Sequence, residues 1–531
     1  MLIHLPIHAE FACVPGNVTI NDLPDELIIS IARFITPDIN CDPLLASQTH
    51  VNNGTLLKLA LCSHRFRSIV EPVLYERFHD NWGSGGCLDG FMVRLLTQPD
   101  LGRRVKFIHW QKILSYTFPV TSFGEEGWKA ARNQIMGLYE NPAEPDVWDE
   151  TVEEVGLEAI VGLLFVLTPN LEELVLCSCD PIGPRPPVLK WMSAVIRRLQ
   201  LQRQLENPAA LWKLRSVNVS MWATGGMDLN HVMELITIPS VEIFWGWALH
   251  ETVLRDFLQA NNFVLDNIKE LDLTFDHVDP DILKQFLCRF PSLKRLSCSI
   301  HEPDDLESYP PDLVLVPHSL ESQLEYLAIS DYAIPMTGGI LIHRKLKSLA
   351  SFKNLRTLRT DWPQLVGQTD IVGDLADTLF GQDVPETSRH MADVIPTSLE
   401  RLTLRGDCAS APAVIFELLK QKHRFPNLKY LDLEWLCILY PDKLIPEDPH
   451  IHRLFSKAES LECLSMCRDA GVEIVMQTQP PECKHISYPA KDEQGNVTGE
   501  MVDYLIEYPY DDYYKICIEN GCDLATGRPP D

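Results

Sequence analysis

The sequence has no surplus of basic residues and no apolar run long enough to cross a membrane. Lysine and arginine together number 46 against 74 aspartates and glutamates, so the 531-residue chain has a formal charge of -28. The negative electrostatic potential of such a chain repels the phosphate backbones of nucleic acids and the surfaces of anionic lipids. No run of about 20 apolar residues occurs, and the opening residues lack a basic start and are broken by Pro6. We therefore expect no nucleic-acid or membrane partner, and a cytoplasmic or nuclear location.

Motifs for metal binding and catalysis are also missing. The 15 cysteines are scattered, and the close pairs Cys177/Cys179 and Cys463/Cys467 are not joined by second pairs at zinc-ligand spacing. No Gly-Lys-Ser/Thr phosphate loop, no His-Glu-x-x-His and no Gly-x-Ser-x-Gly occurs. We expect reduced core thiols, no metal, no cofactor and no catalytic residues. A triad dispersed along the chain is an alternative that one sequence leaves open.

Two amphipathic pieces near the N-terminus are the most informative part of what is present. The first begins with Pro24 in the first turn of an expected helix and carries Leu27 and Ile31 on one apolar side. The second piece carries Leu57 and Phe66 among apolar positions spaced by three and four residues. Two or three short helices are therefore expected in this part of the chain.

This segment resembles the F-box, a helical module that binds the Skp-type adaptor of cullin ubiquitin ligases. The matching features are the opening Leu-Pro at 23–24, Cys-Ser-His-Arg-Phe at 62–66 and Pro-Val-Leu-Tyr at 72–75. Residues 36–55 form an insertion where the family has a short turn. The resemblance implies that the adaptor is bound by an apolar surface made of Leu23, Pro24, Leu27, Ile28, Ile31, Leu57, Leu61 and Phe66. The alternative is an ordinary helical hairpin packed on the rest of the chain.

A second pattern, the phrase Leu-x-x-Leu-x-Leu with apolar variants, recurs through the rest of the chain. Its copies begin at Leu171, Leu214, Ile268, Leu293, Leu324, Leu355, Leu399, Leu428 and Leu461, with a weaker copy at Val241. Most copies follow one another at close to the leucine-rich-repeat period. Each phrase predicts a turn that feeds a short parallel strand with inward leucines, and amphipathic stretches at 281–290 and 414–420 predict helices between strands.

Together these patterns predict an α/β chain, with an N-terminal helical F-box followed by an irregular leucine-rich-repeat solenoid. Parallel strands would line the concave face and helices the convex face, and the repeats resemble the irregular ones behind fungal F-box modules. The expected parts are a tail at 1–20, the F-box-like module at 21–80, a linking or capping helical region at 81–150, the solenoid at 151–480, and an acidic cap or tail at 481–531.

The side chains that point outward between the inward leucines are the candidate substrate site, because a solenoid binds mainly through its strand face. Arginine and aromatic side chains are the anchors that protein interfaces favour. The expected substrate contacts are Arg295, Tyr326, Arg359, Arg401, Arg405 and Tyr430. The arginines would offer a positive strip to an acidic or phosphorylated partner, or would pair with neighbouring acids. Trp245 and Trp247 are at outward positions as well, with core filling as the alternative.

The resemblance implies a non-catalytic subunit of a Skp-cullin-F-box ubiquitin ligase. The helical module would dock the adaptor, and through it a cullin, while the repeats would hold an unknown protein substrate. The contribution to catalysis would be proximity of the substrate lysine to the conjugating enzyme. The alternatives are a non-degradative scaffold or ligand receptor, and a hydrolase hidden in the insertions.

Overall fold

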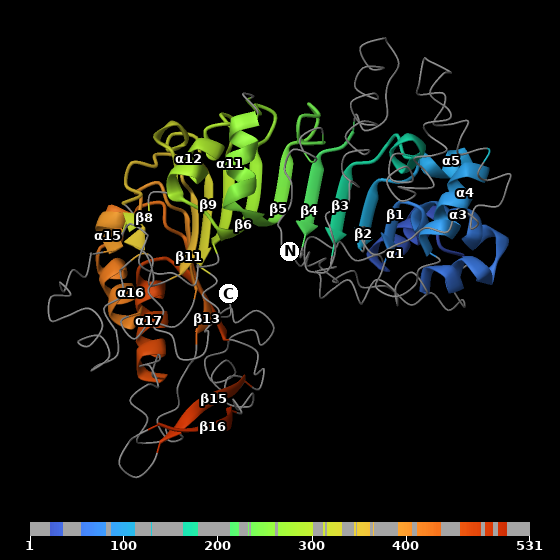
Figure 1. Cartoon of the computed structure of the whole chain (residues 1–531). Helices are drawn as coiled ribbons and strands as arrows, with labels where there is room; N and C mark the ends of the chain where they lie inside the picture. The colour runs from blue at the N-terminus through green and yellow to red at the C-terminus, as the bar shows by residue number, and fades with distance from the viewer. Residues whose placement is uncertain are drawn as a thin grey trace, which may run out of the picture. The chain divides into compact units, whose positions relative to one another are not determined.

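The structure, a computed structural model, describes an α/β chain whose main element is a sheet of twelve parallel strands (Figure 1). The described residues are 22–35, 55–80, 87–111, 163–178, 213–221, 235–260, 264–300, 316–331, 348–361, 391–405, 411–436, 457–478, 484–491 and 497–506, with a few shorter pieces between them. The expected tail at 1–20, most of the insertion at 36–55 and the chain after 506 lie outside these ranges.

The strands follow the order of the chain, each next to the one before it. They are β1 (Arg77–Asp80), β2 (Phe107–Gln111), β3 (Glu173–Ser178), β4 (Ser216–Met221), β5 (Ile243–His250), β6 (Glu270–His277), β7 (Arg295–Ile300), β9 (Tyr326–Asp331), β11 (Thr357–Asp361), β12 (Arg401–Arg405), β13 (Tyr430–Leu436) and β14 (Glu473–Thr478). Two small sheets pair β8 (Asp312–Leu313) with β10 (Lys345–Leu346), and β15 (Lys484–Lys491) antiparallel with β16 (Val497–Ile506).

The chain divides into two compact units, the first formed by residues 1–177 and 186–214 and the second by residues 178–185 and 215–531. The first unit holds α1 (Asp25–Ile35), a helix over 55–62, α3 (His64–Leu74), α4 (Cys87–Thr97) and α5 (Pro99–Gly102). The second holds α11 (Glu251–Ala260), α12 (Pro280–Leu287), η5 (His318–Leu320), α15 (Met391–Val394), α16 (Ala411–Lys420), η6 (Lys422–Arg424) and α17 (Lys457–Asp469). The helices predicted at 281–290 and 414–420 are confirmed as α12 and α16.

The core of the second unit lies between the inward leucines of the strands and the apolar sides of the helices. The expected inward positions Leu271, Leu273, Leu402, Leu404, Leu431 and Leu433 are all fully buried. On the helical side Phe286 meets both Phe257 and Phe290 edge to face. Aromatic pairs in this geometry add to the free energy gained by burying their area. The alternation of buried leucines and outward polar residues is what fixes each strand's outer face.

A polar residue just before the first leucine of several phrases links one repeat to the one before it. The side-chain Nδ2 of Asn267 donates to the carbonyls of Ile236, Ile238 and Val241. The side-chain Nδ2 of Asn354 donates to the carbonyl of Ser322 at 2.6 Å. These contacts satisfy carbonyls that the turn leaves without strand partners. Asparagines just before a phrase therefore tie the start of one repeat to the turn of the preceding one.

One predicted repeat is wrong, and the first two strands of the twelve-stranded sheet were not predicted. The phrase at Leu461 belongs to helix α17, because leucines three residues apart also fit one side of a helix. Cys463 and Cys467 are the fully buried residues described on this helix. The helix ends at Gly471, whose φ of 66° is the left-handed conformation that glycine adopts readily, and β14 follows. Strands β1 and β2 belong to the same sheet, which therefore begins before the expected solenoid range.

The described cysteines are reduced, but they are not all core residues. Cys298, Cys463 and Cys467 are buried, whereas Cys62 and Cys288 are exposed. The expectation of core thiols therefore holds for three of these five positions.

Candidate interaction surfaces

The N-terminal helices enclose a small apolar core of their own. Its buried members are Ile28, Ala32, Leu56, Ala60, Phe66, Ile69, Val70 and Val73. The N-terminus of α3 is capped by Ser63, whose hydroxyl oxygen accepts from the N–H of Phe66 at 3.1 Å. This core is made by α1, the 55–62 helix and α3 alone. The exposed apolar side chains of the same helices take no part in it, so the core does not account for them.

Five large apolar side chains of this helical module are exposed to solvent. Their exposed fractions are 51% for Leu27, 40% for Ile31, 90% for Phe34, 53% for Leu57 and 74% for Leu61. Leu27, Ile31 and Phe34 follow one side of α1 at spacings of four and three, and Leu57 and Leu61 follow one side of the next helix at a spacing of four. We call these five residues the apolar stripes. Elsewhere in the described ranges, only Trp247 and Val264 are large apolar residues with comparable exposure.

The structure corrects two of the residues predicted for the adaptor surface. Ile28 and Phe66 lie in the core of the module, almost completely buried. Each occupies the side of its helix that faces the other helices, which apolar spacing alone does not distinguish from the outer side. Leu23 is half-buried against the same core, and Pro24 is exposed.

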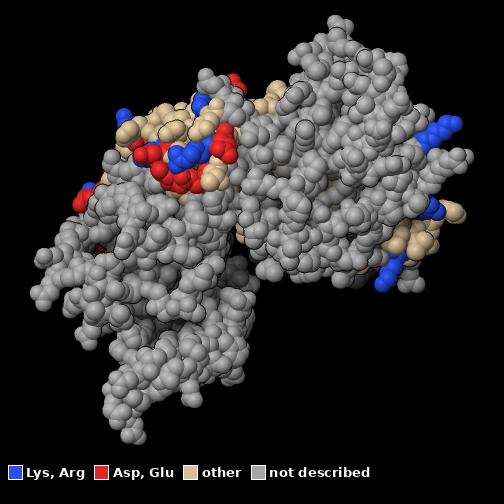
Figure 2. All heavy atoms as spheres, in the orientation of Figure 1, with Lys and Arg blue, Asp and Glu red and all other residues tan. Residues whose placement is uncertain are grey.

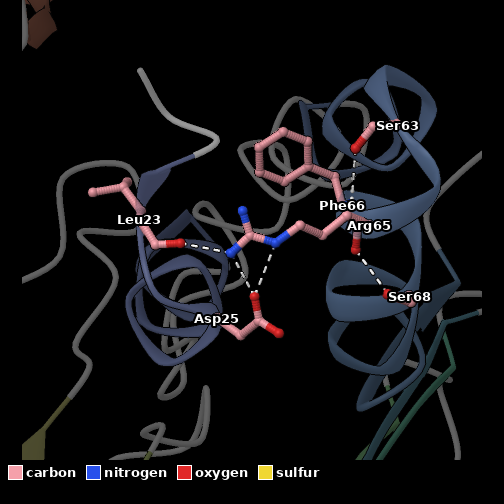
Figure 3. Close-up of polar contacts among 6 residues, drawn as sticks. All are labelled: Leu23, Asp25, Ser63, Arg65, Phe66 and Ser68. Atoms are coloured by element: carbon pink, nitrogen blue, oxygen red, sulfur yellow. Dashed lines mark hydrogen bonds and ion pairs between the residues drawn. The ribbon is translucent and has the colours of Figure 1, made fainter. Parts of the chain in front are cut away.

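Arg65 holds the start of α1 against α3. Figure 3 shows its guanidinium between Leu23 and Asp25. Its Nη2 donates to the carbonyl of Leu23 at 2.6 Å and to Asp25 Oδ1 at 2.6 Å, and its Nε donates to the same carboxylate oxygen at 3.1 Å. Leu23 and Asp25 lie 42 and 40 residues before Arg65, so only the fold reveals this contact.

The outward side chains of the second unit form rows across the sheet, because neighbouring parallel strands are in register. The first row runs Glu270, Arg295, Tyr326, Thr357, Arg401, Tyr430 and Glu473. The second row runs Trp245, Asp272, Ser297, Ala328, Arg359, Thr403 and Asp432. Five of the six predicted substrate residues therefore lie in these two rows.

The exposed arginines of the first row are engaged with neighbouring side chains. Arg295 pairs with Glu270 at 3.1 Å and lies over the ring of Tyr326, 4.2 Å from its centre. Arg401 pairs with Asp432 at 3.6 Å and lies 4.6 Å from the ring centre of Tyr430. Of the two alternatives for these arginines, the structure shows the pairing with neighbouring acids.

Arg405 is not a surface residue, which corrects its place among the substrate contacts. Its Nε donates to Asp361 Oδ1 at 3.1 Å, and both side chains are almost completely buried. Arg359 is half-buried and hydrogen-bonded to the hydroxyl of Tyr326. Burial raises the pKa of Tyr326, and the charges of Arg359 and Arg295 oppose that rise.

A ladder of charged side chains runs along the edge of the second unit where the strands begin. Its members follow the first leucine of each phrase: Arg215, Glu242, Lys269, Lys294, Glu325, Arg356, Glu400 and Lys429. Each backbone N–H donates to the carbonyl of the member before it, at 2.8 or 2.9 Å. Ion pairs join Arg215 to Glu242 at 3.0 Å, Lys269 to Glu242, Lys294 to Glu325 at 3.0 Å, and Glu400 to both Arg356 and Lys429.

Charges of the two signs are also mixed on the helices of this unit. Figure 2 shows acidic and basic side chains side by side near the place of α11 and α12, where Glu251 pairs with Arg255 and Asp281 with Lys284. On these two helices, acidic and basic side chains are therefore paired with one another.

The tryptophans of β5 lie on the outer face, beside an acid of β6. Trp247 is 39% exposed, and Trp245 is partly buried next to Asp272, its partner in register. Burial raises the pKa of the Asp272 carboxyl, while a hydrogen bond from Ser297 and the charge of Arg359 oppose the rise. Core filling, the other option for these two residues, does not occur.

The described ranges contain neither a membrane-spanning helix nor a cluster of metal ligands. None of their helices is both long enough and apolar enough to cross a membrane. No three histidine, cysteine, aspartate or glutamate side chains within them are grouped so that they would hold a metal ion. No protein-family model matches the sequence, and no curated protein matches it either.

Proposed function

We propose that this chain is the substrate-recognition subunit of a Skp-cullin-F-box ubiquitin ligase. The helices of residues 22–80 dock the Skp-type adaptor, and the outer face of the sheet binds a protein substrate. The chain performs no covalent chemistry and acts by holding the substrate near the conjugating enzyme.

The observation that carries this proposal is the pair of apolar stripes on a module that already has a closed core. Large exposed apolar side chains at helical spacing are costly in water and are typical of a surface that a partner covers. The sequence of the same helices resembles the F-box, whose partner is the adaptor. The long parallel sheet supports the second half of the proposal, because repeat folds offer extended binding surfaces.

The test is capture of a purified Skp-type adaptor by the full chain and by the double variant Leu57→Asp, Leu61→Asp. Removing these two apolar contacts costs up to about 2 kcal/mol each, so binding should weaken by at least tenfold. The matched control is Val264→Asp, which changes an exposed apolar residue of the second unit. Equal adaptor binding by the double variant and the parent chain would remove the basis of the proposal.

The rival function, a non-degradative scaffold or ligand receptor, shares the adaptor contact and differs in the fate of the captured protein. Reconstitution with the cullin and a conjugating enzyme separates the two. A ligase subunit supports ubiquitin transfer to the protein held by the sheet, and a scaffold holds it unmodified.

A further inference from the structure

We infer that the outer face of β5 and β6 binds an extended segment of a partner protein that carries a lysine or arginine, seated between Trp245 and Asp272. If the proposed function is right, this segment belongs to the substrate. The inference itself rests on three features of the second unit and does not need the adaptor.

The first feature is a hydrogen-bond donor that lacks an acceptor. The indole Nε1 of Trp245 is buried and has no hydrogen-bond partner within the described part of the chain. Buried polar groups are paired in the great majority of proteins, because an unpaired one loses its water without compensation. A backbone carbonyl of a peptide laid over β5 would supply that acceptor once the atoms that enclose Nε1 make way for it.

The second feature is the carboxylate beside it. Asp272 is Trp245's neighbour in register on the next strand, and its charge is poorly solvated because the side chain is largely buried. Ser297 donates to this carboxylate, and Glu270 on the same strand adds to the negative charge of the position. A cation brought by a partner would compensate a charge that water reaches poorly.

The third feature is the aromatic surface next to the acid. Trp247 is the one large apolar side chain that is exposed on the strands of the sheet, as far as the structure describes them. Tryptophan faces attract lysine and arginine side chains. Neighbouring strands are about 5 Å apart, so a peptide laid over β5 would have both Trp245 and its in-register neighbour Asp272 close to its residues.

The surrounding charges favour a basic segment over an acidic one. Arg295 and Arg401 pair with Glu270 and Asp432, and Arg405 is buried with Asp361. Arg359, whose charge acts on the Asp272 carboxyl, and Arg295 are on strands beyond β6, on the side away from Trp245. An acidic segment would have to displace existing pairs, whereas a basic segment approaching over β5 meets the tryptophans and the carboxylate.

The experiment uses the full chain and three fluorescent peptides of nine residues in a Gly-Ser background, with two Lys-Arg pairs, two Glu-Asp pairs or two Gln-Gln pairs. Fluorescence anisotropy should show binding of the basic peptide and weaker binding, by at least tenfold, of the other two. Asp272→Asn and Trp245→Phe should each weaken the basic peptide by at least tenfold. The control Asp266→Asn removes an exposed acid of the same unit and should leave binding unchanged.

Equal binding of the acidic peptide, or full binding by Asp272→Asn, would overturn the inference. Equal loss in Asp266→Asn would also overturn it, since the attraction would then come from the net charge alone. Thermal melts of both site variants verify folding, and Asp272→Asn keeps the inference testable if Trp245→Phe unfolds. The peptides bind without the adaptor, so failure of adaptor capture and failure of this inference are separate results.

Discussion

Arg405 and Asp361 form an ion pair that is enclosed by the protein, with 3.1 Å between the guanidinium Nε and the carboxylate Oδ1. The two residues are 44 positions apart in the chain and belong to the neighbouring strands β12 and β11. The pair joins two successive repeats from the outer side of the sheet, where Arg295 and Arg401 are exposed. Its role is therefore structural, and this leads to the first prediction.

Arg405→Leu should destabilise the second unit by about 3 to 5 kcal/mol, because it leaves a buried carboxylate without its cation. Chemical denaturation followed by circular dichroism measures the change. The matched control is Arg401→Leu on the same strand, whose exposed pair should cost at most about 1 kcal/mol. The double variant Arg405→Leu, Asp361→Leu should recover much of the loss, and equal effects of the two single variants would contradict the assignment.

His109 on β2 should make the first unit sensitive to mild acid. Burial lowers the pKa of this imidazole to about 4 from an ordinary value of 6.5. A lowered histidine pKa means that the neutral ring contributes stability above about pH 6.5, and this contribution is lost as the pH falls toward 4. The wild-type chain should lose up to about 3 kcal/mol over this window relative to His109→Phe, by the free energy per pKa unit. The prediction is wrong if the free energy of unfolding changes with pH in the same way for the wild type and for His109→Phe.

The charge ladder predicts a small, salt-dependent stability. Lys269 and Arg215 lower the pKa of Glu242 through hydrogen bonds, so its contribution is present above the carboxyl's unfolded pKa and is lost as the pH falls through the lower folded value. Because these side chains are partly exposed, Glu242→Gln should cost only about 0.5 to 1 kcal/mol. The loss should disappear in 1 M salt, where charges are screened within about 3 Å. A loss that salt does not change would point to packing instead.

Arg65→Ala should loosen the start of α1 without unfolding the sheet. The variant removes the contacts to Leu23 and Asp25, and since both partners are partly exposed the cost should be about 1 kcal/mol. Hydrogen exchange should speed up at the amides of Leu27 and Ile28, which donate to the carbonyl of Pro24. Arg67→Ala on the same helix is the control, and an equal rise there would show that Arg65 has no special role.

The alternation of leucines was enough to predict the strands of the twelve-stranded sheet from β3 to β13 and the burial of their inward positions. Strand β2 was missed although Val105, Ile108 and Trp110 occupy the three apolar positions of the phrase. A phrase that accepts any large apolar residue at its three leucine positions, and not leucine alone, includes this strand. The phrase at Leu461 shows the opposite error, because two leucines three residues apart suit a helix as well as a turn and a strand.

The candidate surfaces were less predictable, since they depend on contacts between distant residues. The spacing of Ile28 and Leu27 does not tell which of them faces the other helices. The partner of Arg295 is Glu270 on the previous strand, and that of Arg405 is 44 residues away. The length of each repeat decides which acid lies beside which arginine on the next strand. Because the repeat lengths are irregular, these pairs could not be predicted from the sequence.

The alternating signs of the ladder restrict how this unit can change in length. Loss of the single repeat that carries Glu400 would bring Arg356 against Lys429, and like charges on neighbouring strands are destabilising. Within the alternating stretch from Lys294 to Lys429, loss or duplication of two successive inner repeats would leave neighbouring ladder residues opposite in sign. A pair of repeats is therefore the preferred step by which this stretch could lengthen or shorten. Among the eight ladder residues, the adjacent Lys269 and Lys294 are the one place where two neighbours carry the same charge.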